Sequence, residues 1–147
     1  MRDRYPDPAD RPFAVGAVSP TELLDRAIAA RELAYTPYSG FSVGAALLCA
    51  DGSIYTGCNI ENAAFSPTAC AERVAVFSAI ADGRRDFRAI AVVGGRAGEA
   101  PGYVTPCGVC RQVLAEFCDE DMQVILLNRG EPEILTLGGL LPLSFTL

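Results

Sequence analysis

Short apolar strand patterns alternate with helical segments along this chain, and this alternation limits the folds that the chain can adopt. Residues 41–50 and 53–58 predict a β-hairpin, because Asp51-Gly52 between them is a strong two-residue turn signal. Further strands are predicted over residues 87–93, 122–127 and 133–137, the last at an edge of the sheet. Strands interleaved with helices favour a layered α/β fold, and the hairpin makes its sheet mixed. We therefore expect a three-layer α-β-α architecture around a sheet of about five strands.

The first helical segment has a clear start signal. Ser19-Pro20-Thr21-Glu22 is a capping box with proline at the first helical position, and it predicts a helix that runs to about Tyr35. The apolar residues near one face of this helix are Leu24, Ala27, Ile28 and Ala34. Later helices are predicted over residues 70–81, 107–117 and 138–141, and the glycine-rich residues 94–102 predict a loop.

The chain divides into two unequal parts. Residues 1–18 carry prolines and charges without periodicity and predict a disordered or loosely packed extension, whereas residues 19–147 predict one domain. The extension has charges and prolines where a signal peptide needs an apolar core, so we expect a cytoplasmic protein with reduced thiols. We expect no membrane partner, because no apolar stretch approaches the length of a membrane span.

The composition excludes several kinds of chemistry. The chain contains no histidine, and all 12 basic residues are arginine. Ser-His-Asp or Cys-His catalysis, an imidazole metal site and a lysine Schiff base are therefore impossible, and acid–base chemistry must fall to Asp, Glu, Cys or Tyr. The formal net charge of -6 makes nucleic acid a poor partner, since affinity for a phosphate backbone comes mostly from clustered cations.

The cysteine pattern points to a metal. Cys107 and Cys110 stand three residues apart at a predicted helix start, and Cys70 stands at the start of another. Helix N-termini stabilise thiolates, and three thiolates converge if the two helix starts meet. A catalytic zinc ion takes three protein ligands and keeps its fourth position for water. We therefore predict one zinc ion per chain, bound by Cys70, Cys107 and Cys110.

Three thiolates with a divalent cation leave one negative charge, which needs compensation. Arg73, on the same helical face as Cys70, and Arg111, next to Cys110, are both candidates. Glu72 is the obvious acceptor for a proton from the water. On an ideal helix Glu72 lies nearly opposite Cys70, so both reach one spot only if the site lies at the very end of the helix.

A lone C-x-x-C motif has other interpretations. It is also typical of structural zinc sites and of redox pairs, in which Cys107 would be the nucleophile at a helix start. A noncatalytic zinc or redox domain therefore remains an alternative, although it leaves Cys70-Ala71-Glu72 unexplained. The other cysteines, Cys49, Cys58 and Cys118, are predicted to be small core residues.

Two cysteine motifs and three longer segments carry a family resemblance. Cys-Ala-Glu-Arg at residues 70–73 is followed by Pro-Cys-Gly-Val-Cys-Arg-Gln at residues 106–112. This order resembles the zinc-dependent cytidine deaminases in their small, three-cysteine, homotetrameric form. Similar segments are Tyr-Thr-Pro-Tyr-Ser-Gly-Phe-Ser-Val-Gly-Ala-Ala-Leu, Gly-Cys-Asn-Ile-Glu-Asn-Ala-Ala-Phe and Leu-Leu-Pro-Leu-Ser-Phe. The resemblance covers roughly residues 20–145 and implies a cytidine-deaminase-like fold.

The resemblance also implies roles for residues at matching positions. Glu72 would be the catalytic residue that shuttles protons. Phe41 would pack on the pyrimidine, and the backbone around Ala71 would meet its carbonyl. Asn59 and Glu61 would hold the ribose hydroxyls, which agrees with the chemistry of an amide and a carboxylate facing a diol.

Assembly is implied in the same way. The last 14 residues, 134–147, contain no charged side chain, and exposed apolar segments usually mark interfaces. In the family, Phe145 would match a tail aromatic that closes a neighbouring pocket, and Phe65 would lie in a loop that faces across subunits. Phe65 stands where tyrosine is common, so a hydroxyl contact there is lost. The resemblance implies a homotetramer.

The implied function is hydrolytic deamination of cytidine and deoxycytidine with release of ammonia, a reaction of pyrimidine salvage. The partner would be a small pyrimidine nucleoside. A deaminase of a related aminopyrimidine nucleoside, such as blasticidin S, is the alternative within the same chemistry.

Overall fold

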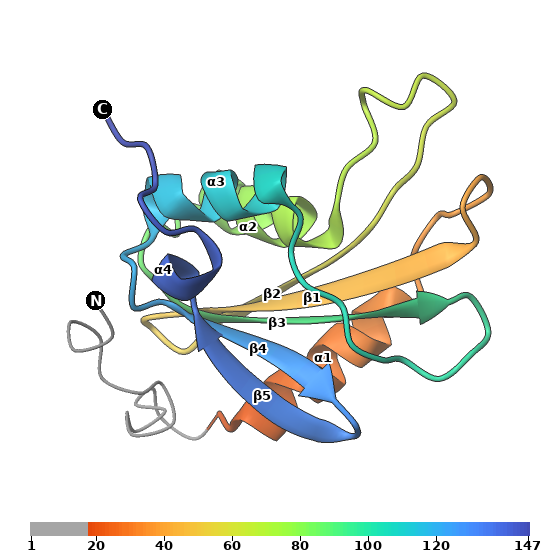
Figure 1. Cartoon of the computed structure of the whole chain (residues 1–147), viewed down its shortest axis with the longest axis horizontal. Helices are drawn as coiled ribbons and strands as arrows, with labels where there is room; N and C mark the ends of the chain where they lie inside the picture. The colour runs from red at the N-terminus through yellow and green to blue at the C-terminus, as the bar shows by residue number, and fades with distance from the viewer. Residues whose placement is uncertain (1–17) are drawn as a thin grey trace.

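The structure, a computed structural model, describes residues 18–147. The expected extension over residues 1–18 lies almost entirely outside this range, so the domain boundary at residue 19 stays a prediction. In chain order the elements are α1 Pro20–Arg31, β1 Phe41–Cys49, β2 Ile54–Cys58, α2 Ala71–Ala81, β3 Phe87–Arg96, α3 Gly108–Phe117, β4 Gln123–Asn128, β5 Glu131–Thr136 and α4 Leu137–Leu140 (Figure 1). Across the described range, no helix is both long and apolar enough to cross a membrane.

The five strands form one mixed sheet in the order β2-β1-β3-β4-β5. β1 pairs antiparallel with both of its neighbours, so that Gly44 lies opposite Cys58 on one side and Val93 on the other. β3 and β4 are parallel, with Ile90 opposite Val124, and β5 returns antiparallel along β4 at the edge. The predicted hairpin and the predicted mixed sheet are both confirmed.

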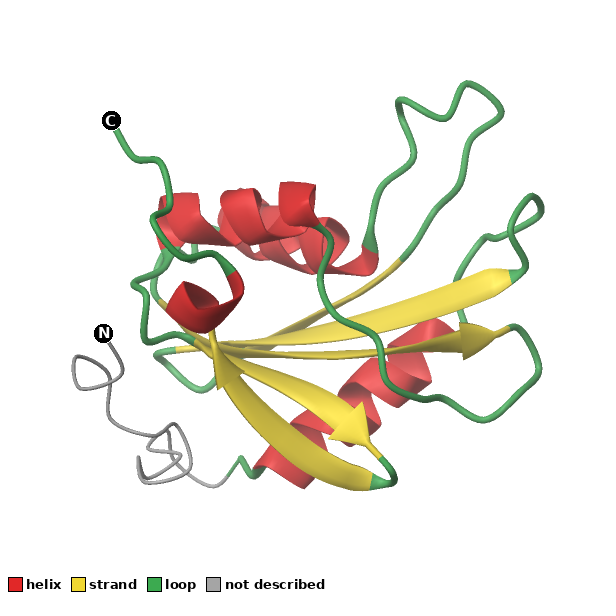
Figure 2. Cartoon of the chain, viewed as in Figure 1, coloured by secondary structure: helices red, strands yellow, loops and turns green. Residues whose placement is uncertain are grey.

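Helices cover both faces of the sheet, as the alternation along the sequence predicted (Figure 2). Successive strand residues point to opposite faces. In β1, Ala46 and Leu48 therefore pack with α1, and Leu47 packs with α2 and α3. The buried core on the α1 face includes Leu23, Leu24, Ala27, Val93 and Ile125. The buried core on the opposite face includes Val76, Ile90, Val92, Leu114 and Leu126. The three-layer α-β-α prediction is confirmed.

The start of α1 has the predicted cap at Ser19, and among the described residues only the Ser19 half of the capping box is formed. The Ser19 hydroxyl accepts a hydrogen bond from the Glu22 main-chain N–H at 3.1 Å. The buried face differs in part from the predicted one. Leu23, Ala30 and Arg31 are buried with Leu24 and Ala27, whereas Ile28 and Ala34 are only partly buried.

The end of α1 was predicted wrongly. The helix ends at Arg31 and does not reach Tyr35. Tyr35 forms a β-bridge with Ile60, because its N–H donates to Asn59 O at 3.0 Å and its carbonyl accepts from Glu61 N at 2.9 Å. This long-range pairing fixes Tyr35 in an extended conformation and removes it from the helix.

Two glycines let helices lie directly on the sheet. A Cβ on Gly44 would come within 2.0 Å of Ala27 O in α1. A Cβ on Gly57 would come within 2.3 Å of Ala71 O, at the start of α2. Any side chain at Gly57 would therefore push away the end of α2 that carries Cys70.

The sequence predicted a loop from residue 94 onward, but Gly94 and Gly95 belong to β3, so this part of the prediction was wrong. β3 continues through them to Arg96, opposite Val43 and Ser42 of β1. Glycine is needed at these positions because other side chains pack closely against the strand, not because the chain turns there. A Cβ on Gly94 would lie 3.0 Å from Phe41 Cε1, and a Cβ on Gly95 would lie 3.1 Å from Arg31 Nη2. The loop begins after β3.

Candidate metal centre and active site

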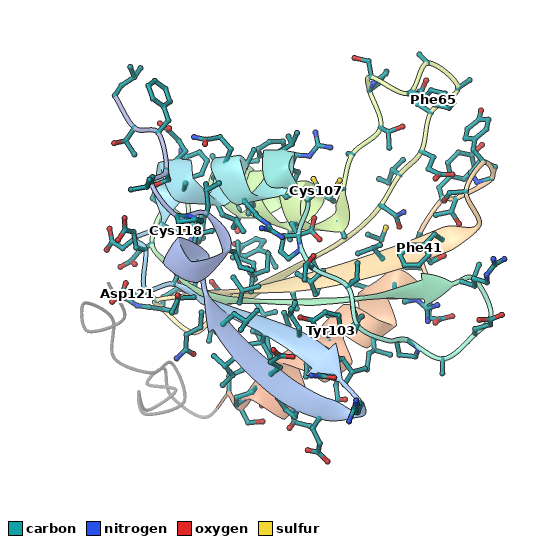
Figure 3. All side chains as sticks on the ribbon, in the orientation of Figure 1. Phe41, Phe65, Tyr103, Cys107, Cys118 and Asp121 are labelled. Atoms are coloured by element: carbon teal, nitrogen blue, oxygen red, sulfur yellow. The ribbon has the colours of Figure 1, made fainter. Side chains whose placement is uncertain are left out.

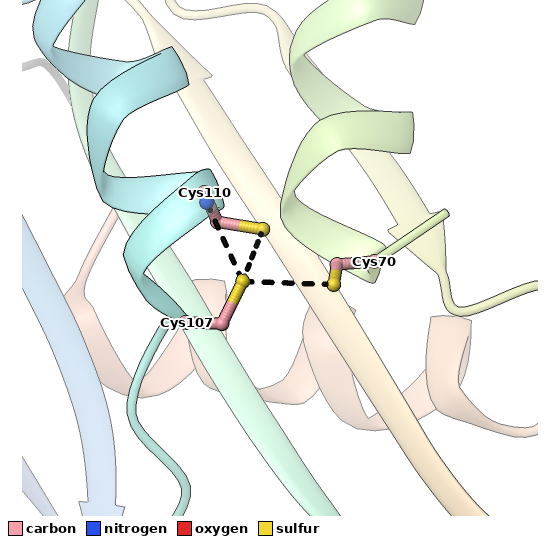
Figure 4. A group of neighbouring side chains, drawn as sticks. All are labelled: Cys70, Cys107 and Cys110. Atoms are coloured by element: carbon pink, nitrogen blue, oxygen red, sulfur yellow. Dashed lines mark hydrogen bonds between the residues drawn. The ribbon is translucent and has the colours of Figure 1, made fainter. Parts of the chain in front are cut away.

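The N-terminal ends of α2 and α3 meet on one face of the sheet (Figure 4). Cys70 is the N-cap residue of α2 and Cys107 is the N-cap residue of α3, both with extended backbone. Cys110 lies in the first turn of α3 and is buried, while Cys107 is exposed. The three sulfurs lie within 4.8 Å of one another. The predicted convergence of the three cysteines is confirmed.

The spacing of these sulfurs fits a zinc ion. Cys70 Sγ and Cys107 Sγ are 3.9 Å apart, and Cys107 Sγ and Cys110 Sγ are 3.5 Å apart. Tetrahedral zinc with Zn–S bonds of about 2.3 Å places its sulfur ligands about 3.8 Å apart. A disulfide needs about 2.05 Å, and all six cysteines are free. Because Cys70 makes a third ligand, the cluster favours a metal site over a Cys107–Cys110 redox pair.

Glu72 lies against this cluster. Its carboxyl group is close enough to the Cys110 and Cys70 thiols to interact with both electrostatically, and the residue is only 4% exposed. Burial raises the pKa of Glu72, because a desolvated site disfavours the charged carboxylate. Cys70 caps α2 from outside the helix and Glu72 lies inside its first turn. The site is therefore at the very end of the helix, which is the condition for both residues to reach it.

Arg73 is the arginine that meets the cluster. Its Nη2 donates to Cys70 Sγ at 3.5 Å and to Thr68 O at 3.1 Å. Arg111, the other candidate, points elsewhere: its Nε donates to Pro106 O and its Nη1 to Leu140 O, each at 2.7 Å. Arg111 therefore fastens the chain before Cys107 to α4 and does not offset thiolate charge.

The thiols differ in their electrostatics. Interaction with the neighbouring Cys110 thiol, helped by Arg73, lowers the pKa of Cys70 to about 5. Interaction with Cys70, together with burial, raises the pKa of Cys110. The Cys70 thiol beside Arg73 therefore ionises more readily than the buried Cys110 thiol.

Asn59, at the end of β2, is tied to the start of β1. Its Oδ1 accepts from Val43 N at 2.8 Å, and its Nδ2 donates to Phe41 O at 2.9 Å. Each side-chain atom keeps further capacity, because an amide oxygen has two lone pairs and an amide nitrogen two hydrogens. Asn59 therefore fixes the position of the Phe41 main chain, and its second Nδ2 hydrogen is still available to bind a ligand.

Glu61 holds a turn in front of the site. Its Oε1 accepts from the N–H groups of Tyr38 and Ser39 at 2.9 and 3.1 Å. Hydrogen bonding from Ser39 is the main cause that lowers the pKa of Glu61. Tyr38, Glu61, Phe65 and Thr68 line an open cleft with a volume of about 270 Å³. Glu61 thus stands at a cleft, as a binding residue would.

Phe65 lies far out on the loop between β2 and α2, and Phe41 lies at the start of β1 (Figure 3). Phe65 is 73% exposed, packs edge-to-face on Tyr38 at 6.3 Å and has a φ of 56°. A left-handed conformation is uncommon for a bulky residue and often marks a functional position. Phe41 is 40% exposed, so part of its ring is free to contact a ligand.

Within a single chain, Phe145 lies in the exposed C-terminal tail and does not reach the thiol cluster. Its side chain is 69% exposed, and its carbonyl accepts from Gln112 Nε2 at 3.2 Å. Leu143 and Leu147 in the same tail are also highly exposed. The last five residues, 143–147, therefore leave their large side chains uncovered in a single chain, whereas Leu137 of the same apolar tail is buried.

One residue of this region, Thr68, was not singled out from the sequence. Thr68 accepts from Arg73 through its carbonyl and lines the cleft beside Glu61. Its position two residues before Cys70 was the available signal. Of the three remaining cysteines, Cys49 is buried as predicted, whereas Cys58 and Cys118 are only partly buried.

Three thiols spaced for zinc, with a buried carboxyl beside them on a three-layer α/β fold, define the class of metal-dependent hydrolytic deaminases. The sequence model of one family, described as the cytidine and deoxycytidylate deaminase zinc-binding region, matches residues 15–126. The chain belongs to this family.

Individual relatives agree with this assignment. A cytidine deaminase from Sporosarcina psychrophila is 57% identical over 118 residues, which cover 80% of this chain and 84% of that protein. The crystal structure of cytidine deaminase from Burkholderia pseudomallei matches with a TM-score of 0.80 and 46% identity, covering 87% of this chain and 100% of that chain. A blasticidin-S deaminase from Bacillus cereus is more distant, with 32% identity over 108 residues, 71% of this chain and 76% of that protein.

Proposed function

We propose that this chain is a zinc-dependent enzyme that hydrolyses cytidine and deoxycytidine to uridine and deoxyuridine with release of ammonia. The observation that carries the proposal is the buried Glu72 carboxyl beside Cys110, in a cluster of sulfurs spaced for zinc. The 57% identity to a cytidine deaminase supports cytosine nucleosides as the substrate class. The free nucleoside, rather than nucleic acid, suits the net charge of -6.

Cys70, Cys107 and Cys110 would hold one zinc ion per chain, which when bound supplies an activated water for attack on the ring carbon that bears the amine. Glu72 moves the protons. Its carboxylate accepts a proton from the attacking water and delivers it to the ring nitrogen. It then carries the proton of the added hydroxyl to the amine, which departs as ammonia while the carbonyl of uridine forms. Arg73 donates to Cys70 Sγ at 3.5 Å and offsets the negative charge that three thiolates bring.

The nucleoside would lie between the thiol cluster and the start of β1. Phe41 offers a partly exposed apolar face to the pyrimidine. The N–H of Ala71, the first residue of α2, has no partner within the helix and suits the pyrimidine carbonyl. The spare Nδ2 hydrogen of Asn59 and the Oε2 atom of Glu61 are assigned to the ribose hydroxyls, because Glu61 uses Oε1 to hold its turn.

The active form would be a homotetramer. Phe65 is 73% exposed on its loop and Phe145 is 69% exposed in a tail without charged side chains, so each would be covered by a neighbouring subunit. The tail aromatic would close a neighbour's pocket. Closed symmetry is usual for homo-oligomers.

The enzyme would act in the cytoplasm, in pyrimidine salvage. Six free cysteines and a thiolate metal site suit a reducing compartment. Recovery of uridine from cytidine is the metabolic use that such a reaction serves.

A substrate panel tests the proposal. Ammonia release is measured with cytidine, deoxycytidine, cytosine, blasticidin S and single-stranded DNA, each at the same concentration. We expect rapid deamination of both nucleosides and slow reaction of the free base. Blasticidin S as the preferred substrate would establish the alternative, which the 32% identity to a blasticidin-S deaminase makes a defined candidate. Zinc-loaded protein that deaminates none of them would contradict the proposal and support a noncatalytic domain.

A further inference from the structure

Arg31, the last residue of α1, is a buried cation held by main-chain carbonyls from three places in the chain. Only 3% of the residue is exposed. Its Nε donates to Ser42 O at 3.0 Å, its Nη1 to Glu99 O at 2.8 Å and its Nη2 to Arg96 O at 2.6 Å. Every partner that residues 18–147 give this side chain is a neutral carbonyl. A guanidinium presents its donors in a rigid planar fork, so it fixes these carbonyls relative to one another.

Two of the carbonyls belong to the end of the β1·β3 ladder. Phe41 lies opposite Arg96, and Ser42 lies opposite Gly95. The guanidinium therefore ties these last pairs to α1. Ser42 is in step along β1 with Gly44, whose Cβ would meet Ala27 O of α1, so its side chain points to the α1 side of the sheet. Phe41, its neighbour in the strand, therefore points to the opposite side, where α2 and α3 carry the thiols.

The packing on the two faces of β3 links Arg31 to Phe41. A Cβ on Gly95 would lie 3.1 Å from Arg31 Nη2 and 3.1 Å from Ala100 O. A Cβ on Gly94 would lie 3.0 Å from Phe41 Cε1. Consecutive residues of one strand thus support the guanidinium on one face and the aromatic ring on the other. Movement of the guanidinium would shift the strand on which the ring rests.

We propose that Arg31 is a positioning residue for substrate binding: it fixes the start of β1 so that the Phe41 ring stays where the pyrimidine packs. The inference rests on the proposed function, because it takes Phe41 as the ring contact. Arg31 acts from the far side of the sheet and touches neither the thiols nor the nucleoside. Since Phe41 contacts the pyrimidine before and during the reaction alike, displacement of Phe41 raises KM more than it lowers kcat.

Arg31→Lys is the first test, because lysine keeps the charge but cannot hold three carbonyls in a planar fork. We expect KM for cytidine to rise about 3- to 10-fold, the scale of one aromatic contact, while kcat and zinc content stay close to wild type. Arg26→Lys is the matched control, since Arg26 is an exposed residue of the same helix. It should leave KM unchanged.

A double-mutant cycle separates positioning from general structural damage. Phe41→Ala raises KM by itself, and adding Arg31→Lys to Phe41→Ala should raise KM no further, because the ring through which Arg31 acts is gone. If Arg31→Lys does not fold, Gly95→Ala replaces it in the cycle. The added methyl would lie 3.1 Å from both Arg31 Nη2 and Ala100 O, so it crowds the guanidinium without removing the arginine charge.

Two results would overturn the inference: an Arg31→Lys enzyme with wild-type KM, or KM increases that multiply in the double variant. Both assume a wild-type enzyme that deaminates cytidine and a Phe41→Ala variant with raised KM. If wild-type protein with full zinc releases no ammonia from cytidine, the proposed function fails, and the inference fails with it. If the wild-type enzyme is active but the KM increases of Arg31→Lys and Phe41→Ala multiply, only the positioning role of Arg31 is contradicted.

Discussion

Arg73 and Cys70 are joined across the first turn of α2, with Nη2 of the guanidinium 3.5 Å from the sulfur. The same nitrogen donates to Thr68 O at 3.1 Å, so the side chain also fastens the loop that enters the helix. The Nε of Arg73 is buried and makes no hydrogen bond with the described residues. A buried donor without a partner costs free energy. The contacts of Arg73 with Cys70 Sγ and Thr68 O therefore hold its side chain in this position, although one of its own donors has no hydrogen-bond partner.

Arg73→Gln should reduce turnover about 10-fold, because a charge-assisted hydrogen bond to the thiolate contributes about 1.5 kcal/mol and glutamine carries no charge. Zinc content should stay near one ion per chain, since all three cysteines remain. Steady-state kinetics and metal analysis on the same sample check both statements. Arg88→Gln, at an exposed residue paired with Asp86, is the control. Unchanged turnover in Arg73→Gln would show that the cluster needs no cation.

Cys70→Ala should lose zinc, because a two-sulfur site from Cys107 and Cys110 lacks the third protein ligand of a catalytic zinc ion. Metal analysis after dialysis is the measurement. Cys49→Ala is the matched control, because Cys49 is a buried cysteine outside the cluster. The control should keep its zinc. Full zinc occupancy in Cys70→Ala would leave only a bare C-x-x-C site and contradict the ligand assignment.

Glu72→Gln should keep the fold and the zinc but lose at least about 100-fold in turnover, the usual scale of general acid–base catalysis. Glutamine has nearly the same shape, so it retains the packing of a residue that is 4% exposed. Single-turnover measurements with cytidine give the rate, and metal analysis shows that the site is intact. A Glu72→Gln enzyme with wild-type turnover would require a different proton carrier.

Glu61 should contribute to the acid sensitivity of the fold. Hydrogen bonds, first from Ser39, lower its pKa in the folded state. Its stabilising contribution is therefore present above the unfolded pKa of about 4.3 and is lost as pH falls through the lower, folded value. Between about pH 6 and pH 3.5, Tm should fall further for wild type than for Glu61→Gln. Thermal unfolding at several pH values checks this, and identical acid slopes would contradict it.

Removal of residues 143–147 should weaken cytidine binding without emptying the zinc site. The tail carries Phe145, which the proposed assembly places over a neighbour's pocket, and it contains none of the three cysteines. Light scattering at several dilutions, with activity measured on the same samples, gives the assembly state of the full chain and of the truncated one. A fully active monomer of the full chain, of about 15.5 kDa, would show that the site needs no neighbour.

Elements dominated by local signals were predictable from the sequence. The cap at Ser19, the Asp51-Gly52 turn and the cysteines at two helix starts each depend on residues a few positions apart. The end of α1 was not predictable in this way, because the bridge between Tyr35 and Ile60 spans distant parts of the chain.

The path of β3 through two glycines was also not predictable from local sequence. Gly94 and Gly95 look like loop residues in the sequence, but the strand passes through them because Phe41 and Arg31 occupy the space where their side chains would lie. The roles of Arg73 and Arg111 were equally open, since both follow a cysteine closely. Only the placement of α4 beside α3 gives Arg111 its carbonyl partner on Leu140.

The most direct test of the account is cytidine turnover measured against zinc content. Zinc is removed from the wild-type protein with a chelator and returned in steps, and ammonia and uridine are quantified at each step. Activity should rise in proportion to bound zinc up to one ion per chain, with equal amounts of ammonia and uridine. Protein with one zinc ion per chain that releases no ammonia from cytidine would contradict it.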